Sequence, residues 1–299
     1  MKKIIASILA IMMFGLCMAG CTQAESGPAE TYYTVSGNFK DVSVKTITEG
    51  KLTVAISPDF APMEFVDPSK TGQDQYVGFD VSLAKYLAEG LGKELEIMPM
   101  DFQACQTAVA MGTVDMSISG FSWTEERAEN YNLSDYYYAG DNETEQVLIT
   151  TKANEGKFTT ADSVADLKVG AQAASLQEGL CKEQLPNTEL VVFTDINTGV
   201  LQLKKGDFDV MAVATGNADA IISSNPDVAL AGFNFEVSEE ESNNLILLKK
   251  GNDELTKQVN DLLAKAYAAG YYGQWYAEAE ELAGIGVEIS YDEKGNPIT

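Results

Sequence analysis

The stretch Gly112–Arg127, GTVDMSISGFSWTEER, contains residues whose types and spacing could bind an anion. Its first half, Val114–Ser119, alternates apolar and polar residues as a short strand does. Ser122 and Glu125 then fit the S-x-x-E capping box, which predicts a helix beginning just after the strand and its turn. A helix N-terminus exposes unpaired backbone N–H groups, and Arg127 adds a planar fork of five donors within the first turn. Together these groups predict a receptor for a carboxylate.

Most capping boxes only cap a helix, so the functional hypothesis depends on the residues around the box. The pattern G-x-x-D-x-x-x-S-G-x-S-x-T-x-x-R resembles the amino-acid-binding branch of the periplasmic solute-binding proteins of ABC importers, bacterial family 3. The resemblance implies that serines, a helix N-terminus and the arginine hold the α-carboxylate of the ligand. The ligand-binding residues implied here are Ser119, Gly120, Phe121, Ser122 and Arg127.

Composition excludes several classes of function. The 299 residues include 20 basic and 45 acidic side chains, and the net charge of −25 argues against binding to nucleic acid or to anionic lipid surfaces. The sequence contains no histidine, which excludes Ser-His-Asp and Cys-His catalysis and imidazole metal sites. These exclusions remove most hydrolase mechanisms, and together with the resemblance above we expect a binding protein with no catalytic residue, no metal and no cofactor.

The N-terminal segment predicts export. Two lysines precede the apolar run Ile4–Leu16, which is too short to span a membrane and is typical of a secretory signal. The small residues before Cys21 resemble the lipobox of bacterial lipoproteins, in which that cysteine is lipidated and becomes the mature N-terminus. We predict a signal peptide at 1–20, a lipid anchor at Cys21 on the extracytoplasmic face, and a flexible tether at 21–45.

The alternation of strands and helices after the tether predicts a parallel α/β sheet. Lys51–Ile56 alternates as a strand. Asp80 is a suitable N-cap for a helix that begins there, and Leu95–Met98 is predicted as the next strand. The loop Ser57–Phe65 resembles the family stretch in which an aromatic residue stacks on the ligand, and Phe60 occupies that position. The alternative for Phe60 is an aromatic residue of the core.

The second half of the chain repeats this arrangement. Leu167–Ala171 reads as a strand, and Ser175 to Glu178 form another S-x-x-E box that opens a helix. Two helix N-termini, one from each half, could therefore face one cleft. The resemblance implies that Ser175 is a second donor to the carboxylate, and that Gln172 and Leu176 line the pocket.

The sequence departs from the family at the end of one predicted strand. Gly206–Ala214, GDFDVMAVA, matches the family wording, but most members end this strand with an aspartate that pairs with the α-ammonium group of the ligand. Here Ala214 occupies that pocket position, and a buried ammonium group without a countercharge is costly. Either another acid substitutes, with Asp59, Glu64 and Asp219 as candidates, or the ligand is not a plain α-amino acid.

Two cysteines lie in the predicted folded part. Cys105 falls on the apolar face of a predicted helix, which favours a small buried hydrophobic residue. A disulfide with Cys181 is possible in an exported protein. The family comparison places the two cysteines in opposite lobes, where such a bond would oppose lobe motion, so we expect free thiols.

The resemblance covers Gly50–Ala283 and implies an α/β, two-lobed periplasmic binding protein-like fold (type II), with a mostly parallel sheet flanked by helices in each lobe. The predicted division is 46–142 with 237–290 for lobe 1, 143–236 for lobe 2, and 291–299 for a C-terminal tail. The implied function is capture of an amino acid or a related small carboxylated solute by hinge closure. The implied partners are an ABC permease and its ATPase, and we expect a monomer.

Two alternatives stay open at this point. Some proteins of this fold are exported dehydratases, in which a carboxylate of the cleft acts as a general acid. Others are sensing receptors, whose closure informs a kinase and does not feed a permease. Turnover of a bound organic acid would favour the first alternative, and uptake that is unaffected by deletion would favour the second.

Overall fold

The computed structural model describes most of the folded part of the chain, namely residues 44–137, 145–284, 290–291 and 297–298. The chain divides into two compact units, Met1–Ser36 and Gly37–Thr299, and every described residue belongs to the second. The predicted signal peptide, the lipid anchor at Cys21 and nearly all of the tether lie outside the described residues. Within the described ranges, no helix is long and apolar enough to cross a membrane.

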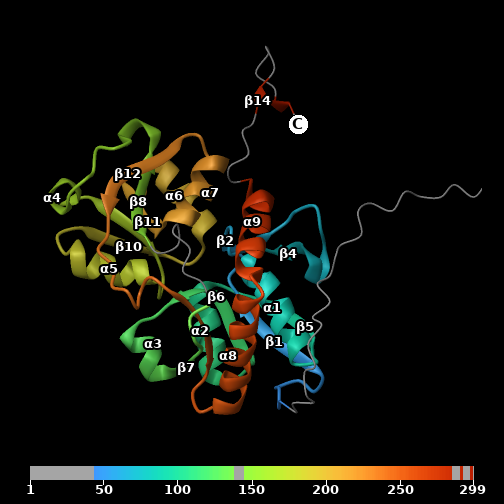
Figure 1. Ribbon diagram of the computed structural model, residues 1–299. Coiled ribbons are helices and arrows are strands. Elements are labelled where there is room, and N and C mark those ends of the chain that lie inside the picture. The colour runs from blue at the N-terminus through green and yellow to red at the C-terminus, as the bar shows by residue number, and fades with distance from the viewer. Residues whose placement is uncertain (1–43, 138–144, 285–289, 292–296, 299) are drawn as a thin grey trace, which may run out of the picture. The chain divides into compact units, whose positions relative to one another are not determined.

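A first five-stranded sheet has the strand order β5-β1-β6-β13-β7 (Figure 1). Its strands are β1 (Lys51–Ile56), β5 (Glu94–Pro99), β6 (Met116–Ser122), β7 (Tyr131–Leu133) and β13 (Asn244–Lys249). β1 pairs in parallel with β5 and β6, whereas β13 runs antiparallel to β6 and β7. We call the part of the protein built around this sheet lobe 1.

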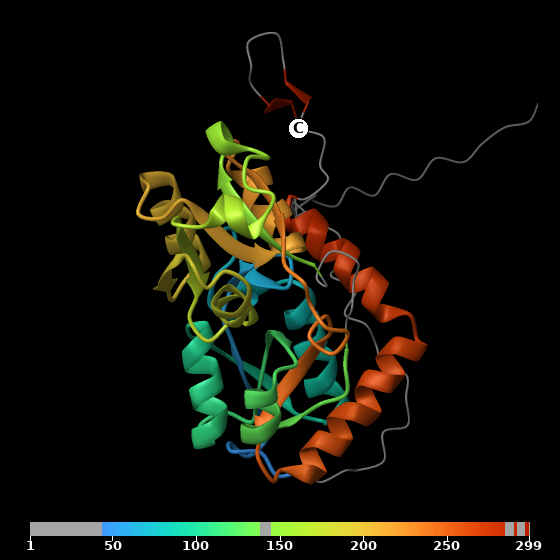
Figure 2. The same ribbon diagram turned by 90° about the vertical axis from the view of Figure 1, so that its left-hand side faces the viewer.

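The central strands of the first sheet are buried on both sides, because helices cover both of its faces. They are α1 (Phe79–Gly90), α2 (Phe102–Met111), α8 (Asp253–Ala268) and α9 (Tyr271–Ala283). Figure 2 shows α2 on one side of the sheet and α8 with α9 on the other. The side chain of Phe79 joins α1 to α9 through edge contacts with the rings of Tyr272, Trp275 and Tyr276.

A second five-stranded sheet has the order β10-β9-β11-β8-β12. Its strands are β8 (Gln146–Thr151), β9 (Lys168–Gln172), β10 (Glu189–Phe193), β11 (Val210–Ala214) and β12 (Val228–Asn234). β9 pairs in parallel with β10 and β11, and β8 runs antiparallel to β11 and β12. We call the part built around this sheet lobe 2.

The strands of lobe 2 send alternate side chains to opposite faces, as the period of a strand requires. Leu148 and Ala212 pack on the face covered by α5 (Leu176–Gln184). Their chain neighbours Ile149 and Val213 pack on the other face, under α6 (Ile196–Lys205) and α7 (Thr215–Ser224). Two layers of apolar side chains therefore hold the helices whose first turns face lobe 1.

The chain completes lobe 1 only after it has built lobe 2, because β13 follows β12 and returns to the first sheet. This mixed α/β architecture confirms the predicted fold class. The predicted residue boundaries of the lobes stay predictions. Both thiols, Cys105 and Cys181, are buried and free, as expected.

A small antiparallel sheet, in the order β2-β3-β4, adjoins lobe 1. Its strands are β2 (Asp59–Phe60), β3 (Glu64–Val66) and β4 (Tyr76–Val77). The remaining short elements are η1 (Gly72–Gln75), α3 (Glu125–Asn130), η2 (Lys152–Asn154), α4 (Ala161–Val164), β14 (Ser290–Tyr291) and β15 (Pro297–Ile298). The predicted loop that contains Phe60 is thus the hairpin of β2 and β3.

Asp80 is not the N-cap of α1, and that prediction is wrong. The N-cap is Gly78, whose φ of +120° suits glycine and whose added Cβ would lie 2.3 Å from the carbonyl oxygen of Met63. Asp80 is the second residue of the helix and is fully buried. Its carboxylate accepts hydrogen bonds from the backbone N–H of Gly120 at 2.8 Å and from the hydroxyl of Tyr137 at 2.9 Å.

Candidate functional site

A narrow cleft between the two lobes contains most of the residues that the sequence singles out. Lobe 1 contributes residues of β2, β6, α2 and the start of α3, and lobe 2 contributes β9, β11 and the first turns of α5, α6 and α7. The cavity volume inside is about 30 Å³, so the two lobes lie close together here. Nine of the ten predicted ligand-binding residues line it: Phe60, Ser119, Gly120, Ser122, Arg127, Gln172, Ser175, Leu176 and Ala214.

Arg127 is the only arginine in the sequence, and it is buried at the edge of this cleft with 3% exposure. Its Nη1 donates to the carbonyl oxygen of Ser122 at 2.6 Å, and its Nη2 donates to the carbonyl oxygen of Ala174 in lobe 2 at 2.9 Å. Its Nε lies 3.5 Å from the amide oxygen of Gln106. All three acceptors are neutral.

The guanidinium of Arg127 lies against two aromatic rings. Its carbon is 5.2 Å from the ring centroid of Phe121 and 5.5 Å from that of Phe102, distances at which a cation and a π face attract. Phe121, the tenth predicted residue, is fully buried against Phe102 and does not line the cleft, so it supports Arg127 from behind.

The charge of Arg127 has no anionic partner among the described residues, because no ion pair includes it. Burial lowers the pKa of Arg127 to about 10, so the side chain is still a cation at neutral pH. A buried cation that is bonded only to neutral acceptors is costly and favours any anion that can reach it. A carboxylate can accept two parallel hydrogen bonds from a guanidinium.

The predicted capping box at Ser122 is wrong. β6 continues through Ser122 because β13 pairs with it there, with Asn244 opposite Ser122. The N-cap of α3 is Thr124, whose hydroxyl oxygen accepts from the N–H of Arg127 at 3.2 Å. α3 has only six residues, so the guanidinium carries the anion-binding chemistry here, and the helix N-terminus does not.

Ser119 points toward a buried acid. Its hydroxyl oxygen accepts from the N–H of Ser57 at 3.0 Å, and its hydroxyl group donates to the carboxylate of Glu64. Glu64 is fully buried, and desolvation raises its pKa well above the usual range, with repulsion from Asp80 as a further cause. Ser119 therefore has no free hydrogen for a ligand while Glu64 is ionised.

Gly120 allows Phe60 to approach the cleft. An added Cβ would lie 2.6 Å from Cε1 of Phe60, and the φ of Gly120 is +54°. The ring of Phe60 also packs against the apolar cluster under α6 and α7 of lobe 2. Phe60 is half-buried and lines the cleft, an aromatic wall against which a small solute could stack.

In the second S-x-x-E box, the serine caps the helix as predicted. Ser175 is the N-cap of α5, because its hydroxyl oxygen accepts from the N–H of Glu178 at 3.1 Å. The same hydroxyl donates to the carbonyl oxygen of Gln172 at 2.7 Å. Glu178 accepts from the N–H of Ala174 at 2.7 Å. Both functions of the Ser175 hydroxyl are thus used within lobe 2.

Of the three acids suggested as replacements for the missing aspartate, only Asp59 lines the cleft. Ala214 lies at the end of β11 with 2% exposure and provides only a methyl group. Glu64 is enclosed behind Ser119, and Asp219 lies on α7 away from the lining. Burial is the largest influence on Asp59 and raises its pKa to about 7.

Asn217 lines the cleft as well, and the sequence analysis missed it. Its side chain is 2% exposed and donates from Nδ2 to the carbonyl oxygen of Ala61 in lobe 1 at 3.1 Å. Its Oδ1 is buried and has no hydrogen-bond partner among the residues that the structure describes. The available signal was its place three residues after Ala214 and four before Ile221, on the apolar face of a helix.

Two α/β lobes with a cleft between them, and a buried cation inside the cleft, define a two-lobed binding protein. The chain belongs to the bacterial extracellular solute-binding proteins, family 3, whose sequence model matches residues 52–279. That match spans both lobes and every residue of the cleft described above.

Relatives with stated ligands are similar to most of this chain. It is 35% identical over 221 residues to the arginine-binding extracellular protein ArtP of Bacillus subtilis, covering 71% of this chain and 79% of ArtP. It is 27% identical over 228 residues to the L-cystine-binding protein TcyJ of Escherichia coli, covering 76% and 81%. The solved structure of AbpA from Streptococcus pneumoniae bound to L-arginine is 34% identical, with a TM-score of 0.72 and coverage of 78% and 96%. These relatives are binding proteins, which favours the solute receptor over the exported dehydratase.

Proposed function

We propose that this protein captures an amino acid or a related small carboxylated solute between its lobes on the extracytoplasmic face of the membrane, and delivers it to an ABC permease driven by an ATPase. One observation carries the proposal. The single arginine of the chain is buried in the cleft against two aromatic rings, with neutral acceptors only. A carboxylate of the solute would supply the missing countercharge.

The proposed mechanism is hinge closure. Residues of both lobes line the cleft, and Arg127 is bonded across it to Ala174, so we expect the lobes to part before a solute enters. Parting breaks the bond between Arg127 and Ala174 and frees guanidinium donors. The solute carboxylate then binds Arg127, Phe60 packs on the solute, and the lobes shut around it.

The names of the relatives support the class of solute, because they bind arginine and cystine. Lipidation at Cys21 would hold the receptor at the membrane, and the partners follow from the family to which the chain belongs. Catalysis is no part of the proposal, since the cleft residues named above hold and orient a ligand.

A thermal-shift screen tests the proposal on the purified protein. The panel contains the twenty standard L-amino acids, L-cystine and a set of organic acids, each tested on the wild type and on Arg127→Met. A ligand that binds only the folded state adds about 2.7 kcal/mol at a hundredfold excess over its dissociation constant. We expect a shift with at least one amino acid that is lost in Arg127→Met. No shift with any member of the panel, or a shift unchanged in the variant, would contradict the proposal.

A further inference from the structure

The family resemblance implies an acid that faces the ammonium group of the ligand at the end of β11, and this position is apolar here. Ala214 ends β11 and offers a buried methyl group, so an ammonium group bound beside it would have no anion there. A buried ammonium group requires both a countercharge and hydrogen-bond acceptors. These groups must come from other cleft residues if the ligand carries such a group.

Asp59 places a carboxyl group where the charge is required, and a bound ammonium group would lower its raised pKa and keep it ionised. It lies on β2 and lines the cleft. Among the described residues, no lysine or arginine forms an ion pair with it. Its Oδ2 accepts from the N–H of Ile196 at 2.7 Å and from Nε2 of Gln172 at 3.3 Å, both in lobe 2. Its Oδ1 accepts from the hydroxyl of Ser57 at 2.8 Å. The side chain of Asp195 also contacts this carboxyl group and repels its charge, and a cation bound here would offset that repulsion.

Asn217 supplies an acceptor that nothing in the described structure satisfies. Its Nδ2 donates to the carbonyl oxygen of Ala61, which fixes the orientation of the amide and leaves Oδ1 without a partner. A buried acceptor without a donor is unfavourable and rare in native proteins. It therefore points to a donor that is absent here, and an ammonium group is such a donor.

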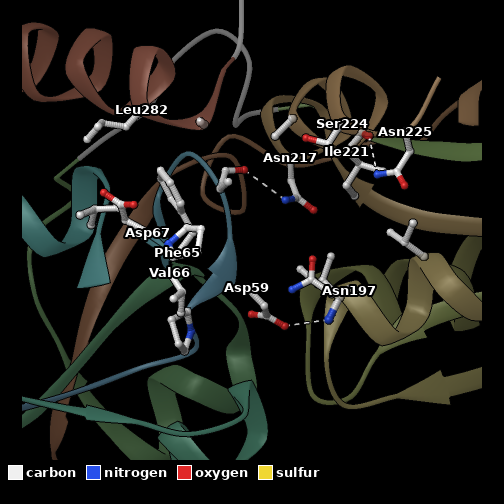
Figure 3. A pocket seen from close by; sticks show the side chains of 18 of the residues that line it. Asp59, Phe65, Val66, Asp67, Asn197, Asn217, Ile221, Ser224, Asn225 and Leu282 are labelled. Atoms are coloured by element: carbon white, nitrogen blue, oxygen red, sulfur yellow. Dashed lines mark hydrogen bonds between the residues drawn. The ribbon is translucent and has the colours of Figure 1, made fainter. Parts of the chain in front are cut away.

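The two side chains approach the same space from opposite lobes. Figure 3 shows Asp59 from β2 and Asn217 from α7 directed into the gap between the lobes. Both line the cleft, and both also line the larger groove of about 1220 Å³ that opens beyond it. An ammonium group held by both would join lobe 1 to lobe 2, just as a carboxylate at Arg127 would.

We propose that Asp59 and Asn217 form the site for the ammonium group of the solute, replacing the acid that Ala214 lacks. This inference rests on the proposed function, and it narrows the solute to one with both a carboxylate and an ammonium group. Asp59 provides the charge, Asn217 provides a second acceptor, and closure brings the two together.

Titration calorimetry on the full mature chain tests this assignment. The probes are the twenty standard L-amino acids, L-cystine and, for each that binds, the analogue with hydrogen in place of the α-amino group. We expect the wild type to prefer the amino acid. Asp59→Asn and Asn217→Ala should each weaken binding of the amino acid by about tenfold or more, and weaken binding of the analogue much less. Asp219→Asn, an acid of α7 outside the lining, serves as the matched control and should change neither affinity.

A gain-of-function variant guards against variants that merely fold poorly. Ala214→Asp places a carboxylate at the end of β11, so it should restore the preference for the amino acid in the Asp59→Asn background. Equal losses for amino acid and analogue, or no losses, would overturn the ammonium site while the receptor proposal stands. A wild type that prefers the analogues would overturn it too. A wild type that binds no amino acid and no analogue would overturn the proposed function itself, and this inference with it.

Discussion

The guanidinium of Arg127 in lobe 1 donates a 2.9 Å hydrogen bond to the carbonyl oxygen of Ala174 in lobe 2. Ala174 has a φ of +58°, a left-handed conformation that is uncommon for residues other than glycine and that tends to occur at functional sites. This backbone turn directs the carbonyl at two donors of lobe 1, Arg127 and the amide of Gln106 at 3.1 Å. We infer that a bound carboxylate takes over the Arg127 donors from this carbonyl.

Changes at Arg127 should therefore affect ligand affinity more than folding. Arg127→Met removes the charge and keeps much of the packing, and we expect binding of any carboxylated solute to weaken by about 2 kcal/mol or more. Arg127→Lys keeps the charge but loses the planar fork, so its affinity for the solute should lie between that of the wild type and that of Arg127→Met. The free energy of unfolding without ligand should change by less than about 2 kcal/mol, because the wild-type guanidinium is buried without an anion. Calorimetry and urea unfolding on the same samples measure both effects, and a lysine variant with full affinity would contradict the account.

Gly120→Ala should disturb the aromatic wall of the cleft. The new Cβ would lie 2.6 Å from Cε1 of Phe60 at a φ of +54°, so the ring must move and the backbone is strained. We expect a loss of about 1–2 kcal/mol in the free energy of unfolding, together with weaker solute binding. Gly92→Ala is the matched control, since Gly92 has a φ of +65° and no atom within 4 Å of an added Cβ. It should reproduce the strain and leave affinity unchanged, and equal affinity in both variants would refute the role of Phe60.

The unliganded protein should lose stability as pH rises from about 5 to 8. Burial raises the pKa of Asp59 to about 7 and that of Asp80 to about 6, and it holds the pKa of Glu64 well above its usual range. The folded state then keeps protons that the unfolded chain has released at about pH 4, so the free energy of unfolding falls across this window. A shift as large as that of Asp80 corresponds to about 3 kcal/mol.

Urea unfolding at a series of pH values checks this dependence. Glu64→Gln should flatten the curve, because it removes one of the buried titrating groups. Asp67→Asn is the control, since Asp67 bonds to Ser69 in a surface turn, its pKa is lowered, and its influence lies at lower pH. A free energy of unfolding that rises between pH 5 and 8 would contradict the burial of these acids.

Cys105 and Cys181 should be inert in the folded protein. Both are buried, and burial raises the pKa of each thiol, that of Cys181 to about 12. Thiolates are the reactive form, so a thiol reagent at pH 8 should label neither cysteine in native protein and both after unfolding. The measurement uses the chain without residues 1–20 and with Cys21→Ser. Rapid labelling of native protein would show that one of the two sites is open.

The order of motifs made much of the cleft predictable, because the predicted residues stand near the end of a strand, in the first turn of the helix that follows it, or on the hairpin of β2 and β3. The carboxyl ends of neighbouring parallel strands meet at one edge of a sheet, so such residues gather without further information. Gly120 and Phe60 illustrate this, since they come from different elements and their contact leaves no room for a Cβ.

The predictions that were wrong concern residues whose structural partners lie far away in the sequence. The N-cap of α3 is Thr124 and not the predicted Ser122, because pairing with β13 extends β6 through Ser122. That pairing joins residues more than a hundred positions apart. Asp80 looked like an N-cap and is in fact a buried acceptor for Gly120 and Tyr137. Periodicity could not rank Asp59 against Glu64 either, since only the tertiary fold decides which acid reaches the cleft.

A crystal structure of the protein with the amino acid that gives the largest thermal shift would show directly whether Arg127 binds the solute carboxylate. We expect the ligand between the lobes, with its carboxylate within hydrogen-bond distance of the Arg127 guanidinium and its side chain against Phe60. We also expect that the bond between Arg127 and Ala174 is exchanged for bonds to the ligand. A ligand bound only in the outer groove beside Val66 and Leu282, with Arg127 still on Ala174, would contradict the account.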